Sequence, residues 1–167
     1  MVIIGIDPGY AIVGYGVVDY TSSRFTTYAY GAVTTPAGML FPQRLDIIYD
    51  EISRLLIKYK PQAMAVEKLF FQNNKTTAID VAQARGVLLL AAQKCGVEVF
   101  EYTPLQVKQA VVGYGRAVKT QVQEMTKSLL KLETVPKPDD TADALAIAIC
   151  HAHCAGSGMS LRILNSK

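Results

Sequence analysis

The stretch VIIGIDPGYAIVGYGVVD, residues 2–19, indicates how this chain folds. Residues 2–7 are apolar up to Asp7, and Pro8 and Gly9 then interrupt the run as a turn does. Residues 12–19 form a second apolar run, and residues 24–33 alternate between polar and apolar side chains. Connections this short predict three antiparallel strands in a meander.

The rest of the chain alternates between helical and strand patterns. Apolar residues recur at helical spacing in residues 41–59, Pro61 ends that helix, and Gly96 suits the end of a later one. Short apolar runs predict further strands at residues 63–67 and 97–102, and the remaining helices are expected at residues 76–94, 104–112, 119–131 and 139–153. This order predicts an α/β fold in which a mixed five-stranded sheet carries helices on both faces.

The composition suits one globular domain with a substantial core. The chain has 167 residues, of which 50% are hydrophobic and 19% charged, with a net charge of +3. We expect a domain over residues 1–154 and a flexible tail over residues 155–167. The first apolar run has no basic segment before it and is broken at Asp7, so a signal peptide or membrane span is not expected. Three cysteines, an odd number, argue against a disulfide framework and fit a reducing cytoplasm.

The helix expected at residues 76–94 is apolar on nearly every side. A helix that covers a sheet with one face normally shows a single apolar stripe. Here apolar side chains surround much of the helix: Ile79, Val81, Val87, Leu88, Leu89 and Leu90. We therefore expect its second face to pack on another subunit.

Four carboxylates, those of Asp7, Glu67, Asp140 and Asp143, fall where strands end or a helix begins. Taken singly, Asp7 suits a turn, Glu67 suits a strand end in water, and an acid such as Asp139 suits a helix N-cap. Asp140 and Asp143, however, are one turn apart on one helix face, just before a buried run. Four converging carboxylates suggest a divalent metal, and two metal ions held this way hydrolyse phosphodiesters.

A basic segment follows the last expected strand. Between residues 104 and 132 a single acid, Glu124, stands among five cations: Lys108, Arg116, Lys119, Lys127 and Lys131. Basic residues beside an acidic metal site suit a phosphate-backbone ligand, although a solvated helix face is the plainer interpretation. The run Cys150-His151-Ala152-His153-Cys154 lacks a second ligand pair, which disfavours a zinc site.

The sequence resembles the RuvC-type Holliday junction resolvases of the ribonuclease H-like superfamily. The resemblance covers nearly all of residues 1–153. It is carried by IIGIDPG (3–9), GYGVVD (14–19), AVEKLFFQNN (65–74), AQARGVLLLAA (82–92), VFEYTPLQVKQAVVGYGRAVKTQV (99–122) and DDTADALAIAI (139–149). The blocks AQARG, QVKQAVVG and DxxDALAIA are long and specific.

The resemblance implies roles for individual residues. The catalytic acids and ligands of Mg²⁺, or of Mn²⁺, with two ions per site, would be Asp7, Glu67, Asp140 and Asp143. Some relatives carry His at the position of Asp140. The candidate DNA-binding residues are Phe70 or Phe71, which would stack near the crossover, and Lys108, Arg116 and Lys119. The family pairs as a homodimer through the helix that contains AQARG, with candidate contacts at Ile79, Ala82, Arg85, Gly86 and Leu89.

The implied activity is symmetric, metal-dependent cleavage of opposing strands of a four-way DNA junction. The products would carry 5′-phosphate and 3′-hydroxyl ends, and the implied partners are the RuvA and RuvB branch-migration proteins in recombination and repair. Two other classes fit parts of the sequence. A phosphotransferase of the actin and hexokinase type also opens with a strand, an Asp-x-Gly turn and a hairpin, but needs a longer chain. A junction-binding module without activity would have to tolerate four acids that repel phosphate.

Overall fold

The computed structural model describes residues 1–69, 75–155 and 161–162. In these residues the strands form one sheet of order β3-β2-β1-β4-β5-β6. The strands are β1 (Val2–Asp7), β2 (Ile12–Thr21), β3 (Arg24–Thr34), β4 (Ala63–Glu67), β5 (Glu98–Tyr102) and β6 (Leu161–Arg162). β1, β2 and β3 form an antiparallel meander, and β1, β4 and β5 run parallel. The predicted mixed five-stranded sheet is confirmed, with the two-residue β6 added antiparallel to β5.

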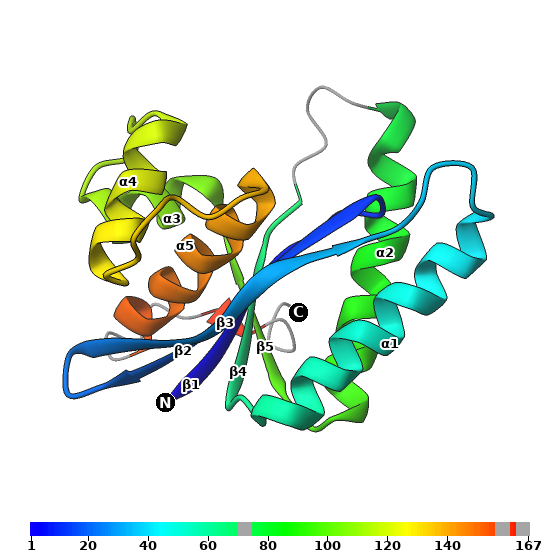
Figure 1. The fold of residues 1–167 in the computed structure, drawn as a ribbon, viewed down its shortest axis with the longest axis horizontal. Helices are drawn as coiled ribbons and strands as arrows, with labels where there is room; N and C mark the ends of the chain where they lie inside the picture. The colour runs from blue at the N-terminus through cyan, green and yellow to red at the C-terminus, as the bar shows by residue number, and fades with distance from the viewer. Residues whose placement is uncertain (70–74, 156–160, 163–167) are drawn as a thin grey trace.

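Helices cover both faces of this sheet, as predicted (Figure 1). On one face lie α1 and α2, and on the other lie α3, α4 and α5. The helices are α1 (Phe41–Tyr59), α2 (Lys75–Lys94), α3 (Pro104–Val112), α4 (Lys119–Leu129) and α5 (Asp139–Cys154). Their bounds lie within two residues of those expected, and α4 ends early because Lys131 adopts a left-handed φ of 54°.

Alternation along β1 assigns its side chains to the two faces. Ile4 and Ile6 pack in the core beneath α1 and α2, whereas Ile3 packs in the core beneath α5. Because successive side chains of a strand point to opposite faces, Gly5 and Asp7 lie on the α5 face with Ile3. In β4, Met64 and Val66 belong to the α1–α2 core and Ala63 and Ala65 to the α5 core, which places Glu67 on the α5 face too.

Two glycines allow α5 to lie directly against the sheet. A Cβ at Gly5 would stand 2.0 Å from the carbonyl oxygen of Ala144, and a Cβ at Gly14 would stand 2.0 Å from that of Asp140. Both conflicts are with helix backbone, which a change of rotamer does not relieve. The close approach brings the first turn of α5 beside the ends of β1 and β2.

The described residues contain no helix that is long and apolar enough to cross a bilayer.

Candidate active site

Asp7 and Glu67 end two neighbouring parallel strands. Ile6 of β1 pairs with Val66 of β4, so the two acids follow at the same edge of the sheet. Both carboxyl groups lie on the α5 face, as argued above, and both are partly buried. Together with Pro8, Lys68, Leu69 and Pro104 they line one hollow. The alternative in which Glu67 simply ends a strand in open water is therefore wrong.

The first two turns of α5 bring Asp140 and Asp143 to this edge. The close packing of the Asp140 backbone on Gly14 fixes the start of the helix over β2. Asp143 lies one turn further along and lines a pocket with Glu67. Strands β1 and β4 and helix α5 thus bring together the four carboxylates that are scattered along the sequence.

The pKa of Asp7 reflects both its burial and the proximity of the other three acids. Burial raises the pKa of Asp7 from its ordinary value of 3.8 to about 8. Repulsion adds to this rise in the pKa, and it comes from Glu67, Asp143 and Asp140. Burial, followed by repulsion from Asp143, likewise raises the pKa of Glu67. Burial and repulsion from neighbouring acids therefore both disfavour the charged forms of Asp7 and Glu67.

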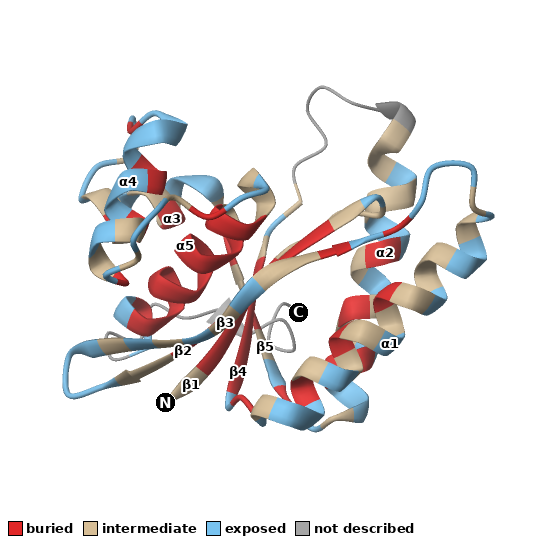
Figure 2. Cartoon of the chain, in the orientation of Figure 1, coloured by how far each residue is buried: buried red, intermediate tan, exposed pale blue. Residues whose placement is uncertain are grey.

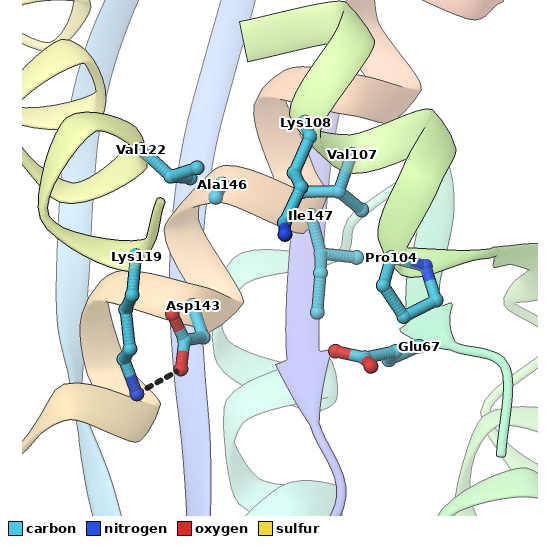
Figure 3. A pocket seen from close by; sticks show the side chains of 9 residues that line it. All are labelled: Glu67, Pro104, Val107, Lys108, Lys119, Val122, Asp143, Ala146 and Ile147. Atoms are coloured by element: carbon cyan, nitrogen blue, oxygen red, sulfur yellow. Dashed lines mark ion pairs between the residues drawn. The ribbon is translucent and has the colours of Figure 1, made fainter. Parts of the chain in front are cut away.

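A pocket beside the acids carries the basic residues. Its volume is about 190 Å³, and it is lined by Glu67, Pro104, Val107, Lys108, Lys119, Val122, Asp143, Ala146 and Ile147. Figure 3 shows the Lys108 amine directed into the pocket between Glu67 and Asp143. Lys108 has this position because α3 starts directly after β5, where Thr103 and Gln106 form a capping box with bonds of 3.2 and 2.8 Å. Carboxylates and cations thus meet in one cavity.

Lys119, the first residue of α4, joins the acids through two ion pairs. Its Nζ lies 3.0 Å from Asp143 Oδ2 and 3.4 Å from Asp139 Oδ2. Burial lowers the pKa of Lys119, but its bonds to Asp143 and Asp139 outweigh this, so the net shift of the pKa is upward. A lysine at a helix start is unfavourable with the helix dipole. Here carboxylates offset that cost, where the sequence suggested a phosphate.

The donor set of the cluster suits a hard divalent cation. All four side chains offer carboxylate oxygens, the ligands that Mg²⁺ and Mn²⁺ prefer. Within residues 1–69, 75–155 and 161–162, no three His, Cys, Asp or Glu side chains already stand close enough to hold an ion. Asp143 is drawn to Lys119 instead. The donor chemistry of the four residues fits a divalent ion, although Oδ2 of Asp143 faces Lys119 here.

The other expected site residues have different surroundings. Arg116 is exposed and is not part of the pocket lining, and Phe70 and Phe71 lie outside the described residues. On α2, Ile79, Ala82 and Gly86 are exposed and Leu89 is half-buried. The Arg85 guanidinium forms an ion pair with Glu101 of its own chain. Homodimer contacts at these five α2 positions stay a prediction.

Sequence reasoning missed two features of the α5 layer. Asp139 is not the N-cap of α5: Pro138 takes that position, and Asp139 instead binds Lys119 and Lys137. The hydroxyl of Tyr102 lies 2.7 Å from Nδ1 of His151 in the core, and burial lowers the pKa of this histidine to about 4. The Lys119–Asp139 and Tyr102–His151 contacts have no local signal, because each joins residues that the fold brings together.

Comparison with known proteins identifies the family. The family model described as crossover junction endodeoxyribonuclease RuvC matches residues 3–151. The protein of that name from Alkaliphilus oremlandii is 58% identical over 153 residues, which are 92% of this chain and 93% of the relative. The one from Clostridioides difficile is 55% identical over 167 residues, 100% and 99% of the two chains. These matches support a nuclease rather than the phosphotransferase considered from the first strands.

Solved structures agree with these matches. RuvC of Thermus thermophilus has a TM-score of 0.91 and 37% identity over 98% of this chain and 100% of its own. The T. thermophilus protein in complex with Holliday junction substrate gives 0.90 and 35% over the same shares. The predicted ribonuclease H-like fold and the predicted endodeoxyribonuclease class are confirmed. This chain belongs to the RuvC family of crossover junction endodeoxyribonucleases.

Proposed function

We propose that this protein resolves four-way DNA junctions by hydrolysing one phosphodiester in each of two opposing strands, leaving 5′-phosphate and 3′-hydroxyl ends. The observation that carries the proposal is the partly buried carboxyl of Asp7, which is repelled by three other carboxylates, two of which line a pocket with Lys108 and Lys119. Such a cluster is costly unless a cation joins it. The relative solved with a Holliday junction supports this substrate.

Asp7, Glu67, Asp140 and Asp143 are the proposed metal ligands. Nucleases of this family are metal-dependent, and we propose two Mg²⁺ ions per site, with Mn²⁺ as an alternative. Bound divalent ions would activate the attacking water and stabilise the leaving oxygen. The chain's own contribution would be to supply four carboxylates from β1, β4 and α5 at one edge of the sheet, beside the pocket that Lys108 and Lys119 line.

The basic side chains hold the DNA strand in this arrangement. Lys108 points into the pocket and would contact a phosphate oxygen next to the scissile bond (Figure 3). Lys119 lies across the pocket, and the exposed Arg116 would contact the backbone further out. Phe70 or Phe71, which follow β4 closely in the sequence, are proposed to stack on a base at the crossover.

Two copies of the site are needed for symmetric cuts. We propose that a homodimer forms through the outer face of α2, where Ile79 is exposed and forms a shallow hollow with Ala78, Ala82 and Gln83. By resemblance, the RuvA and RuvB branch-migration proteins are the proposed partners, and the cytoplasm is the proposed location.

Replacing Asp7 by Asn tests this function directly. The amide keeps the shape of the carboxylate but removes its charge, so cleavage of a four-way junction with Mg²⁺ should fall by about 10³-fold or more. Junction binding in a gel shift should change little. The measurement compares cleavage of a synthetic four-way junction, a linear duplex and a single strand.

Three outcomes would contradict parts of the proposal. Full cleavage by the Asp7→Asn protein would remove the assigned site, and equal cutting of all three substrates would remove the junction selectivity. Binding by the unaltered protein that never leads to nicks, with either Mg²⁺ or Mn²⁺, would favour the binding module without activity. Glu124→Gln, on the exposed side of α4 and outside the pocket lining, is the matched control and should cut normally.

A further inference from the structure

Lys119 forms ion pairs with two acids, and the proposed function assigns a metal-binding role to only one of them. Asp143 is a proposed metal ligand, whereas Asp139 lies one turn earlier on α5 and was not among the expected ligands. The ammonium lies 3.0 Å from Asp143 and 3.4 Å from Asp139, so both carboxylates attract it at once. A single cation therefore bridges a proposed ligand and a residue outside the ligand set.

Each carboxylate oxygen of Asp139 interacts with a lysine. Oδ1 accepts a hydrogen bond of 2.7 Å from Lys137, and Oδ2 faces Lys119. Its side chain is 44% exposed, against 29% for Asp143, so it is the outer of the two acids. It makes no N-cap contact, because Pro138 is the N-cap and forms no side-chain cap bond. Its contacts with other side chains therefore point to the lysines rather than to the end of the helix.

A divalent ion at the carboxylate cluster would compete with Lys119 for Asp143. Oδ2 of Asp143 is occupied by the ammonium, and an oxygen cannot serve a metal ion and an ammonium at 3.0 Å without strong repulsion between the two cations. Once Asp143 turns to the ion, Lys119 loses its shorter contact. Asp139 Oδ2 remains within reach and keeps the ammonium beside the pocket.

We propose that Asp139 is a positioning residue that holds Lys119 at the rim of the pocket while Asp143 binds the metal. The inference rests on the proposed function, since it takes Asp143 as a ligand. Without Asp139, Asp143 is the one ion-pair partner left to the ammonium among the described residues, and the ammonium competes with the ion more strongly. With Asp139 the lysine changes partner and stays where a DNA phosphate enters.

Mn²⁺ binding without DNA tests this exchange by a double-mutant cycle. Isothermal titration in 0.15 M salt, where the fields of exposed charges are largely screened, compares the unaltered protein with Asp139→Asn, Lys119→Met and the double variant. We expect Asp139→Asn to weaken Mn²⁺ binding about three- to fivefold, the range of an exposed ion pair. Lys119→Met should strengthen binding, because the competing cation is gone. In the Lys119→Met background, Asp139→Asn should change binding by less than about 1.5-fold.

Each other outcome of the cycle has a definite meaning. Equal weakening by Asp139→Asn in both backgrounds would overturn the proposal, because Asp139 would then act only through its own charge. No weakening in the unaltered background would overturn it too. Asp139→Glu keeps the carboxylate and should bind Mn²⁺ as the unaltered protein does. If Asp139 only supports folding, Asp139→Asn should instead lower the melting temperature. Failure of every variant to bind Mn²⁺ would sink the proposed metal site as well, whereas binding without coupling sinks this inference alone.

Discussion

Helices α2 and α5 lie on opposite faces of the sheet, and both have apolar side chains around most of their surface. α5 is buried on nearly every side, because the sheet covers one side and α3 and α4 cover the other (Figures 1 and 2). Among the described residues of α2, the fully buried ones form a stripe against the sheet and α1, made by Ala84, Leu88, Ala91 and Ala92. Its outer side leaves Ile79 66% and Leu90 50% exposed.

The different burial of α2 and α5 bears on how a helix without a single apolar stripe is interpreted. Such a helix is expected to be covered on two sides, but the sequence of the helix does not say by what. For α5 the cover comes from later or earlier elements of the same chain. For α2 the described residues supply cover on one side only, and we propose that a second copy supplies the other. Helix α5, which is covered on both sides, carries Asp140 and Asp143, and the half-covered α2 carries the proposed interface.

Adding one methyl group beside α5 or within α2 should change the stability of the protein in opposite directions. Gly5→Ala would place a Cβ 2.0 Å from the Ala144 carbonyl oxygen and force α5 off the sheet, at a cost of about 3 kcal/mol or more in unfolding free energy. A Cβ at Gly86 would meet no atom of the described residues within 4 Å, apart from the backbone of its own helix, so Gly86→Ala should stabilise α2 by about 0.5–1 kcal/mol. Urea unfolding measures both.

The same pair of variants tests what covers α2. If a partner helix packs against Gly86 in the dimer, Gly86→Ala will weaken association even though it strengthens the isolated helix. In sedimentation, that variant should then dissociate at a higher protein concentration than the unaltered chain. A Gly5→Ala protein as stable as the unaltered one would show that α5 does not approach the sheet as described.

Much of the fold could be predicted because its signals are local. Strand alternation, Pro61 and Gly96 set the element bounds to within two residues, and Asp7 and Glu67 were recognised from strands that end on an acid. The balance of charge around the acids could not be predicted in this way. The ion pairs of Lys119 with Asp139 and Asp143 join α4 to α5, and the φ of 54° at Lys131 ends α4 without a glycine. Such contacts depend on how helices dock, and sequence spacing within one helix does not report it.

The outer face of α2 gives the next largest effect. Ile79→Asp places a charge in the proposed interface and should raise the dimer dissociation constant at least tenfold, about 1.4 kcal/mol. Ile57→Asp is the matched control, since Ile57 on α1 is 65% exposed against 66% for Ile79. Sedimentation measures the oligomeric state of each variant.

The two substitutions are equal in chemistry and exposure, so only the location differs. Loss of the dimer in both would point to a general effect of added charge. Loss of the dimer with Ile57→Asp alone would move the interface to α1. A protein that remains monomeric without any substitution would leave α2 half-covered, and the proposed pairing of two sites would fail.

The remaining prediction is a pH dependence of stability that arises from Asp7 on the α5 face. Without metal, the pKa of Asp7 is about 8 in the folded chain against an ordinary 3.8, so the folded state binds this proton more tightly. The resulting stabilisation is fully present below about pH 4 and is lost as the pH rises through 8. In EDTA, the melting temperature should therefore fall between pH 5 and 8. Asp7→Asn should flatten this fall, and its melting temperature at pH 8 should lie above that of the unaltered protein. Ile79→Asp, on the other side of the sheet, should keep the full slope, since its site contains no buried acid cluster.

Parallel curves for Asp7→Asn and the unaltered chain would mean that Asp7 is already balanced by a cation in the folded protein, and the need for a metal at this position would lose its physical basis.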